Sequence, residues 1–337
     1  MTNTLTGINR IAELLRYSTS MSVVQDFLRS KELPFSATGW DDLTNKRIIS
    51  HIDSGKLNEG DFLNLLASVE ECGRQHVFLY KCEPAVALRL LGESRVQSQL
   101  RSRGLDALLT SPLALDVTEV PTIVDVRLEK ANVPLSLTVK EVYSHKAYKP
   151  SSSKEEGNEL IRTWRIITTR AVNVAKLHRD GLLELRLASV SASSYKDQRE
   201  RFVRQLDELI PLHQFSPINF APAKNKLSDG KTELSAKIRF ADTFLRNENG
   251  TTVKVTSGSS NDDLAEDQGA RAGEDAFLGH NGGYADGHNF FIRAVDGVLS
   301  KEILILMSGE PNEFGVMANC SEADYNYVLR ELRNLND

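Results

Sequence analysis

The stretch Arg162–Val190, RTWRIITTRAVNVAKLHRDGLLELRLASV, decides how the second half of this chain is interpreted. Asp180-Gly181 separates two runs in which apolar and polar residues alternate. Asp-Gly is a favoured two-residue type I′ turn, because both central positions need a positive φ. The stretch therefore predicts a β-hairpin. It also holds six Lys/Arg against two acidic residues, the most concentrated basic charge of the chain.

The turn fixes which side chains of the hairpin share a face, because successive residues of a strand point to opposite sides. One face is expected to be core and carries Val172, Val174, Leu183, Leu185 and Leu187. Arg170, Lys176 and His178 share that face near its ends, where we expect them to reach solvent. The opposite face is mostly polar and carries Thr169, Asn173, Ala175, Arg179, Glu184, Arg186 and Ala188.

Two interpretations of the polar face stay open. It could lie along a phosphate backbone, with Arg, Thr and Asn side chains donating to phosphate oxygens. Alternatively, it is the solvated face of an antiparallel sheet, on which Glu184 pairs with Arg179 or Arg186.

On the N-terminal side, residues 1–115 read as an all-α domain without a strong strand. Apolar residues recur at helical spacing, as in Ile11, Leu14 and Leu15 and again in the stripe Phe62–Val69. Beyond Pro121 the period becomes two, which predicts strands at 122–128 and 135–142. The polar segment Lys149–Gly157 is typical of a loop.

The C-terminal part continues with β structure and two helices. Asn249-Gly250 predicts a second type I′ turn between 237–246 and 251–256, and three further strands are expected at 290–295, 303–307 and 314–319. An amphipathic helix is expected at 197–210, and Ser321-Glu-Ala-Asp324 caps a final one. Residues 258–288 are expected to form a mobile acidic and Gly-rich loop. The prediction is an α+β fold: a helical domain at 1–115, then a domain at 118–337 with a mostly antiparallel sheet and flanking helices.

Charge and composition bear on phosphate binding, membrane insertion and cellular location. The formal net charge is −5, but residues 258–275 alone carry six acids and one Arg, so the other 319 residues sum to about zero. A local basic patch can therefore bind phosphate despite the acidic total. No apolar window approaches a membrane span. Three cysteines without CxxC spacing and the lack of a signal-peptide pattern favour an intracellular, cytoplasmic location, or a nuclear one in a eukaryote.

Catalytic and metal motifs are not recognisable. The densest group, 279–289, offers His280, His288 and Asp286 on a Gly-rich segment, which would suit a metal or acid–base chemistry but equally a connection between strands. The Arg-rich helix at 89–103 is interpreted as a solvated face. The expectation is a protein with no catalytic residues, no metal and no cofactor.

Residues 21–53 resemble a SAP-type DNA-binding module. That pattern joins a short helix, an extended link with Leu, a Gly and a second helix with basic and aliphatic residues. The residues that match it are Val24, Phe27, Leu28, Leu33, Gly39, Leu43, Arg47, Ile48 and Ile52. The link departs from it, because Trp40-Asp41-Asp42 is acidic where such modules are usually basic.

A broader similarity, in architecture, is to the centromere protein N family. It is carried by Ile48–His51, Leu57–Leu66, Gln75–Tyr80 and the Ser321-capped final helix. The resemblance implies a helical domain followed by a β-rich one, and nucleosomal DNA bound through basic residues where the two meet. It would nominate Lys46 and Arg47 together with the hairpin arginines.

The sequence is therefore compatible with two functions. The first is a non-catalytic adaptor, DNA-binding or chromosome-associated, that contacts double-stranded DNA through Lys46, Arg47, Arg170, Lys176, Arg179 and Arg186. The second is a protein-interaction subunit of a larger assembly, for example of a bacterial conflict or defence system, which grips a protein partner through the apolar residues around Val77–Tyr80 without direct nucleic-acid contact.

Overall fold

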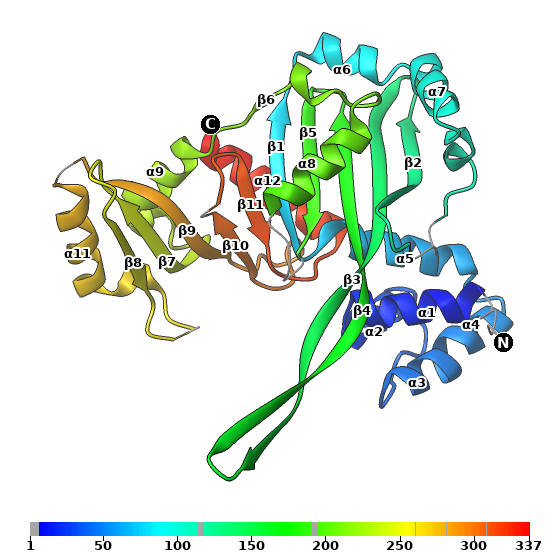
Figure 1. The fold of residues 1–337 in the computed structure, drawn as a ribbon, viewed down its shortest axis with the longest axis horizontal. Coiled ribbons are helices and arrows are strands. Elements are labelled where there is room, and N and C mark those ends of the chain that lie inside the picture. Colours follow the sequence, from blue (N-terminus) through cyan, green and yellow to red (C-terminus); the bar gives the residue numbers. More distant parts are fainter. Residues whose placement is uncertain (1–6, 114–117, 190–194, 260, 281, 308) are drawn as a thin grey trace. The chain divides into compact units, whose positions relative to one another are not determined.

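The computed structural model describes residues 7–113, 118–189, 195–259, 261–280, 282–307 and 309–337 (Figure 1). Helices and antiparallel strand pairs make up the fold, so the predicted α+β class is confirmed. The chain divides into two compact units, each built from three segments. Unit 1 is Met1–Glu71, Leu90–Lys176 and Ala188–Ile210, and unit 2 is Cys72–Arg89, Leu177–Leu187 and Pro211–Asp337.

The first part of unit 1 is helical, as the apolar spacing predicts. Its helices are α1 Gly7–Ser18, α2 Met21–Ser30, α3 Trp40–Leu43, a π-helical segment Thr44–Ile48, α4 Ile49–Asp53 and α5 Glu59–Cys72. Residues at helical spacing, such as Ile11, Leu15, Leu28 and Phe62, are fully buried together in one core. Burying an aliphatic or aromatic side chain contributes about 1.5–3 kcal/mol, so this shared core holds the short helices in place.

The strands of unit 1 follow one another in the order β2-β3-β4, with bounds β2 Thr122–Lys130, β3 Pro134–Glu156 and β4 Glu159–His178. β2 and β3 pair antiparallel, with Thr122 opposite Val142. Val124, Val142, Val172 and Val174 form a buried cluster. Helices α7 Glu93–Ser102 and α8 Tyr195–Leu206 and the 3-10 helix Asp106–Leu109 complete the unit.

β3 and β4 continue past this core as a two-stranded ribbon, here residues 146–169 (Figure 1). Every residue from Pro150 to Ile166 is exposed. The strands are joined at Gly157-Asn158, and Gly157 has a φ of +62°. The expectation of a loop at 149–157 is therefore wrong. The segment is polar because both of its faces meet water, while strand pairing still satisfies its backbone.

The strands of unit 2 follow one another in the order β5-β1-β11-β10-β9-β7-β8, and the two-residue strand β6 lies beside β1. The strand bounds are β1 Gln75–Lys81, β5 Leu182–Ala188, β6 Ser216–Pro217, β7 Ile238–Arg246, β8 Thr252–Thr256, β9 Tyr284–Ile292, β10 Ile303–Met307 and β11 Glu313–Val316. The helices are α6 Pro84–Leu90, α9 Ala221–Asp229, α10 Lys231–Leu234, α11 Gln268–Leu278 and α12 Glu322–Asn336, with 3-10 turns at Leu212–Gln214 and Leu264–Glu266. Phe240, Phe290, Phe314 and Tyr325 are fully buried in its core.

The two tight turns of unit 2 form where the sequence predicts them, but they are not of type I′, because neither Asp180 nor Asn249 has a positive φ. Gly181 has a φ of +91°, and its N–H donates to the carbonyl of His178 at 3.1 Å. A side chain at Gly181 would also collide with the Cys82 carbonyl, so glycine is required twice over. Gly250 has a φ of +79° between the antiparallel β7 and β8. Ser321 forms the expected capping box with Asp324 at the start of α12.

Two expectations for secondary structure are wrong in unit 2. Residues 75–81, in the part expected to be all-α, form β1, because a short apolar run suits a buried strand as well as a helix. The expected loop at 258–288 contains α11 and the start of β9. Asp267 accepts a hydrogen bond from the N–H of Ala270 and so acts as an N-cap, a role that the acidic composition conceals.

Candidate nucleic-acid interface

Lys46 and Arg47, in the π-helical segment of unit 1, occupy different surroundings. The Lys46 side chain is 72% exposed, and its Nζ lies 2.7 Å from Asp42 Oδ1. This hydrogen bond from Lys46 lowers the pKa of the Asp42 carboxyl. Arg47 donates from Nε to the carbonyl of Ser36 at 2.8 Å, so its guanidinium fixes the link before α3. Lys46 is thus exposed but paired with Asp42, whereas Arg47 has a structural role.

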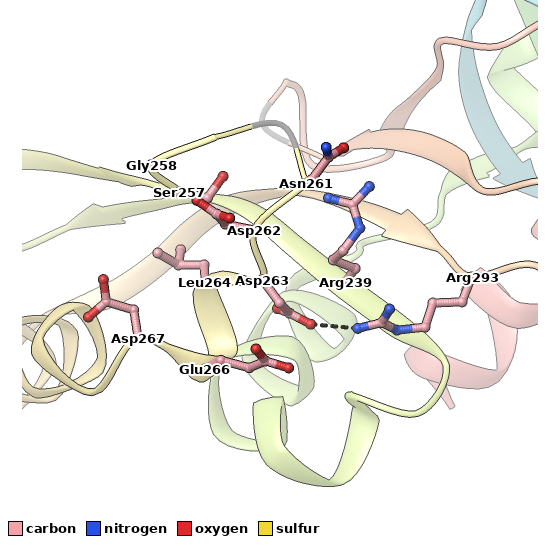
Figure 2. A pocket seen from close by; sticks show the side chains of 10 residues that line it. All are labelled: Arg239, Ser257, Gly258, Asn261, Asp262, Asp263, Leu264, Glu266, Asp267 and Arg293. Atoms are coloured by element: carbon pink, nitrogen blue, oxygen red, sulfur yellow. Dashed lines mark hydrogen bonds and ion pairs between the residues drawn. The ribbon is translucent and has the colours of Figure 1, made fainter.

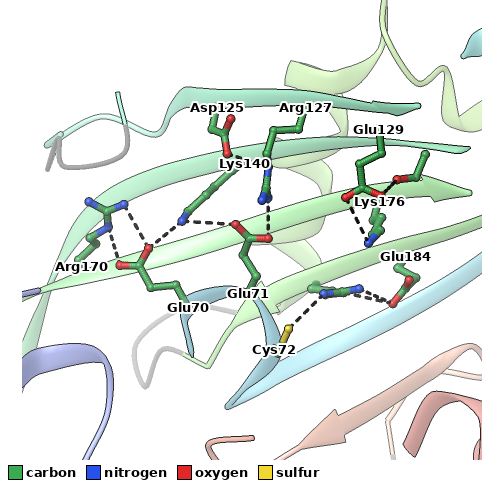
Figure 3. A network of polar contacts seen from close by, with 12 residues as sticks. Glu70, Glu71, Cys72, Asp125, Arg127, Glu129, Lys140, Arg170, Lys176 and Glu184 are labelled. Atoms are coloured by element: carbon green, nitrogen blue, oxygen red, sulfur yellow. Dashed lines mark hydrogen bonds and ion pairs between the residues drawn. The ribbon is translucent and has the colours of Figure 1, made fainter. Parts of the chain in front are cut away.

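Arg170 lies in a buried charge network and not at the surface. Its side chain is 3% exposed, and Nε lies 3.0 Å from Glu70 Oε1. The same carboxylate accepts a hydrogen bond from Lys140 Nζ at 2.8 Å (Figure 3). The expectation that Arg170 reaches solvent is wrong, because Glu70 at the end of α5 neutralises it inside unit 1. No phosphate can reach this guanidinium in the folded protein.

Lys176 and Arg179 differ in how far their side chains are exposed. The Lys176 side chain is 16% exposed, and its Nζ lies 3.9 Å from Glu129 Oε1. Arg179 is exposed beside the Asp180-Gly181 turn. Of the hairpin cations nominated from the sequence, Arg179 is therefore the accessible one.

Arg186 belongs to a buried cluster of unit 2. Its side chain is 5% exposed, and Nη2 lies 3.0 Å from Glu184 Oε2. Tyr325 Oη donates to the same Glu184 oxygen at 2.5 Å, and the Arg186 guanidinium lies over the Tyr325 ring at 4.1 Å. Burial would raise the pKa of Glu184, but Arg186 and hydrogen bonds from His178 and Tyr325 outweigh it and lower the pKa to about 2. Glu184 is therefore a buried anion that holds Arg186 away from any ligand.

Asn173, Glu184 and Arg186 are buried, so at these residues the polar hairpin face is neither solvated nor open to a phosphate. The expected pairing of Glu184 with Arg186 is confirmed. In unit 1, Asn173 donates to Glu141 at 2.7 Å and accepts from Gln198 of α8 at 2.8 Å. In unit 2, Tyr325 of α12 contacts Glu184. Helices α8 and α12 supply partners for these polar groups, each within its own unit.

The accessible basic charge lies instead on the ribbon. Residues 146–153 and 160–169, here called the shaft, contain four cations and no acid: Lys146, Lys149, Arg162 and Arg165. The acids of the ribbon, Glu155, Glu156 and Glu159, flank its turn. Lys146, Arg162 and Arg165 are exposed, and within the described part of the chain no hydrogen bond or ion pair engages their side chains. Sequence reasoning overlooked them, although Gly157-Asn158 is itself a two-residue hairpin signal.

Aromatic and hydroxyl side chains accompany these cations. The exposed fractions of Trp164 and Tyr148 are 52% and 57%. Ser152 and Thr163 hydroxyls are 2.6 Å apart, which places both side chains on one face of the ribbon. Because side chains alternate along a strand, Trp164 and Arg162 lie on the opposite face. A surface with arginine, hydroxyl groups and an open aromatic ring can bind a nucleic-acid backbone and its bases.

Unit 2 also contains a polar recess (Figure 2). It is lined by Arg239, Ser257, Gly258, Asn261, Asp262, Asp263, Leu264, Glu266, Asp267 and Arg293. Asp263 accepts from the N–H groups of Phe240 and Ala265 and pairs with Arg293 at 2.8 Å. Arg239 pairs with Glu302 at 2.6 Å. The contacts of Asp263 tie the 3-10 turn to β7 and to Arg293, which directly follows β9, so these two charges serve the fold.

The histidine-rich segment splits between two elements. His288 lies in β9, fully buried, and burial together with the charge of Lys231 lowers its pKa to about 3. His280 lies just after α11. Among the residues that the structure describes, no group of three or more His, Cys, Asp or Glu side chains is placed to hold a metal. In the same part of the chain, no helix is long and apolar enough to cross a membrane.

No protein-family model matches this chain, and a search of curated proteins found no similar sequence.

Proposed function

We propose that this protein is a non-catalytic DNA-binding adaptor, chromosome-associated in function, which contacts the phosphate backbone through the shaft of its β3–β4 ribbon. The observation that supports the proposal is the exposed run Pro150–Ile166 together with a shaft that carries cations and no acid. Phosphate contacts of this kind dominate the affinity of nucleic-acid-binding proteins.

The distribution of charge favours the shaft over the turn. Glu155, Glu156 and Glu159 would repel phosphates at the turn. Lys154 near the turn is already paired with Glu156 at 2.8 Å. Arg162 and Arg165 project from opposite faces of β4, so a twisted ribbon can direct both toward one backbone.

Of the six cations that the sequence nominated, Lys46 and Arg179 are the exposed ones. Lys46 belongs to the helix–link–helix of residues 21–53, for which the resemblance to SAP-type modules implies DNA contact. Arg179 lies beside a tight turn of unit 2. We assign both a supporting role, because a single exposed cation contributes little by itself.

The proposal is tested with Arg162→Gln combined with Arg165→Gln. We expect weaker binding to duplex DNA, and a slope of log affinity against log salt that is reduced by about 1.8, about 0.9 for each lost phosphate contact. Fluorescence anisotropy at several salt concentrations measures both quantities. Lys237→Gln with Arg330→Gln is the matched control, because these unit 2 side chains are 70% and 63% exposed. Equal losses in both double variants, or no binding by the unaltered protein, would contradict the proposal.

The second candidate is a protein-interaction subunit. The apolar residues around Val77–Tyr80, expected to contact its protein partner, are buried in β1 and do not form such a surface. The candidate is favoured instead by the apolar side chains that the ribbon exposes, since Leu160, Ile161 and Ile166 are 54%, 42% and 58% exposed. Co-purification from the source cell separates the two functions. A stoichiometric protein that survives nuclease treatment supports the subunit, whereas loss of all bound material with the nucleic acid supports the adaptor.

A further inference from the structure

We infer that the ribbon prefers unpaired bases, and that the indole of Trp164 is the platform on which one base stacks. This inference rests on the proposed DNA binding and adds the class of nucleic acid, single-stranded or locally unpaired. Its basis is the position of the indole between cations on an exposed strand.

Trp164 is unusually open for its size. Its side chain belongs to the largest of the apolar types, yet 52% of the residue remains exposed in mid-strand. Among the described residues, none forms an aromatic or cation–π contact with its ring. By contrast Trp40, the second of the two tryptophans, is partly buried against the helical core of unit 1. A free π-face on an exposed indole is what base stacking requires.

The neighbours of Trp164 suit a nucleotide more than an apolar peptide. Arg162 and Ile166 share its face by strand alternation, about 6.6 Å away on either side. Across the ribbon, Ser151–Ser153 border the same shallow depression as Arg162–Trp164. An arginine and serine hydroxyls can donate to a phosphate while the adjacent indole covers the attached base.

Duplex DNA presents few base faces on which this indole could stack. In a duplex the base faces are covered by their neighbours, so a ring can stack only where a base step is opened, at a cost of a few kcal/mol for each step. A single strand presents each base face freely, and every base has a π-face. The ribbon should therefore bind a single strand more tightly than a duplex of equal length and charge contact.

Tryptophan fluorescence and affinity test the inference together. We expect a short oligothymidylate to quench the emission of the full-length protein, and a duplex of equal length to quench it less. Trp164→Phe should remove the quenching, because Trp40 is then the remaining indole. Trp164→Ala should weaken oligothymidylate binding roughly 5- to 150-fold, which corresponds to about 1–3 kcal/mol for one stacked base. Ile161→Ala, on the opposite face of β4, is the matched control and should bind like the unaltered protein.

The outcomes separate this inference from the proposed function. If Arg162→Gln with Arg165→Gln weakens binding but Trp164→Ala does not, the backbone contact stands and the stacking is overturned. Equal quenching by the duplex and the single strand overturns the preference. If the protein binds neither nucleic acid, the proposed function fails as well. Nuclease-resistant capture of a protein, abolished by Trp164→Ala, would assign the indole to a protein partner and overturn the inference.

Discussion

At the scale of single residues, two arginines of β4 show how differently the fold uses one side-chain type. Arg165 is exposed, whereas the Arg170 side chain is 3% exposed against Glu70. We expect Arg170→Met to lower the free energy of unfolding by about 3–5 kcal/mol, because it leaves a buried carboxylate without one partner. Arg165→Met should change it by less than about 0.5 kcal/mol. Urea unfolding of the two variants measures the difference.

DNA binding by the same two variants tests the opposite expectation. Where Arg170→Met is still folded, it should bind DNA as the unaltered protein does, whereas Arg165→Met should bind less tightly. Equal stabilities, or a loss of affinity confined to Arg170→Met, would contradict these assignments. The sequence could not separate the two residues, because the partner of Arg170 lies 100 positions away in the chain. A run of cations shows charge but not which cations the fold neutralises.

At the scale of elements, the ribbon should be dispensable for stability. Replacing residues 148–167 with Asn-Gly should change the free energy of unfolding by less than about 1 kcal/mol, because the excised residues are nearly all exposed and a shorter loop closes slightly more easily. DNA binding should fall at least as far as in Arg162→Gln with Arg165→Gln. Calorimetry and anisotropy on one preparation measure both. A marked loss of stability would show that the ribbon supports the fold. Full retention of DNA binding would show that the interface does not lie on the ribbon.

Elements were predictable where their signal is local. The turns at Asp180-Gly181 and Asn249-Gly250 and the cap at Ser321 depend on two to four adjacent residues, and all three lie at the predicted positions, although neither turn has the predicted type I′ geometry. The β3 half of the ribbon was not found, because strands exposed on both faces lack the apolar alternation by which a strand is usually identified. Strand β1 was missed for the opposite reason, since its residues are nearly all buried.

At the scale of the whole molecule, the α+β class follows from the order of local patterns along the chain. The division of the chain into two units does not follow from these patterns, because each unit combines segments that are far apart in the sequence. The hidden charges are equally non-local. Lys140 with Glu70 in unit 1, and Lys231 with Glu274 in unit 2, are buried ion pairs between residues 70 and 43 positions apart.

Unit 2 should lose stability first on acidification, chiefly through His288. Burial, with the nearby charges of Lys231 and Lys224, lowers the pKa of this histidine from 6.5 to about 3. Between these values the unfolded chain binds a proton that the folded chain does not. The free energy of unfolding should therefore fall by about 1.4 kcal/mol for each pH unit below about 6.5. Folding lowers the pKa of Glu184 from 4.5 to about 2, so this carboxylate causes a further loss of stability as the pH falls from 4.5 to about 2.

In unit 1 burial raises the pKa of Asp125 and of Glu141, so these carboxyls act in the opposite direction as the pH falls. Hydrogen exchange at neutral and mildly acidic pH should therefore show β9 and β7 losing protection before β2 and β3 do. His288→Gln should flatten the dependence of unit 2 on pH, whatever its effect on stability at neutral pH. A slope that is the same with and without the imidazole would mean that His288 does not control the acid response.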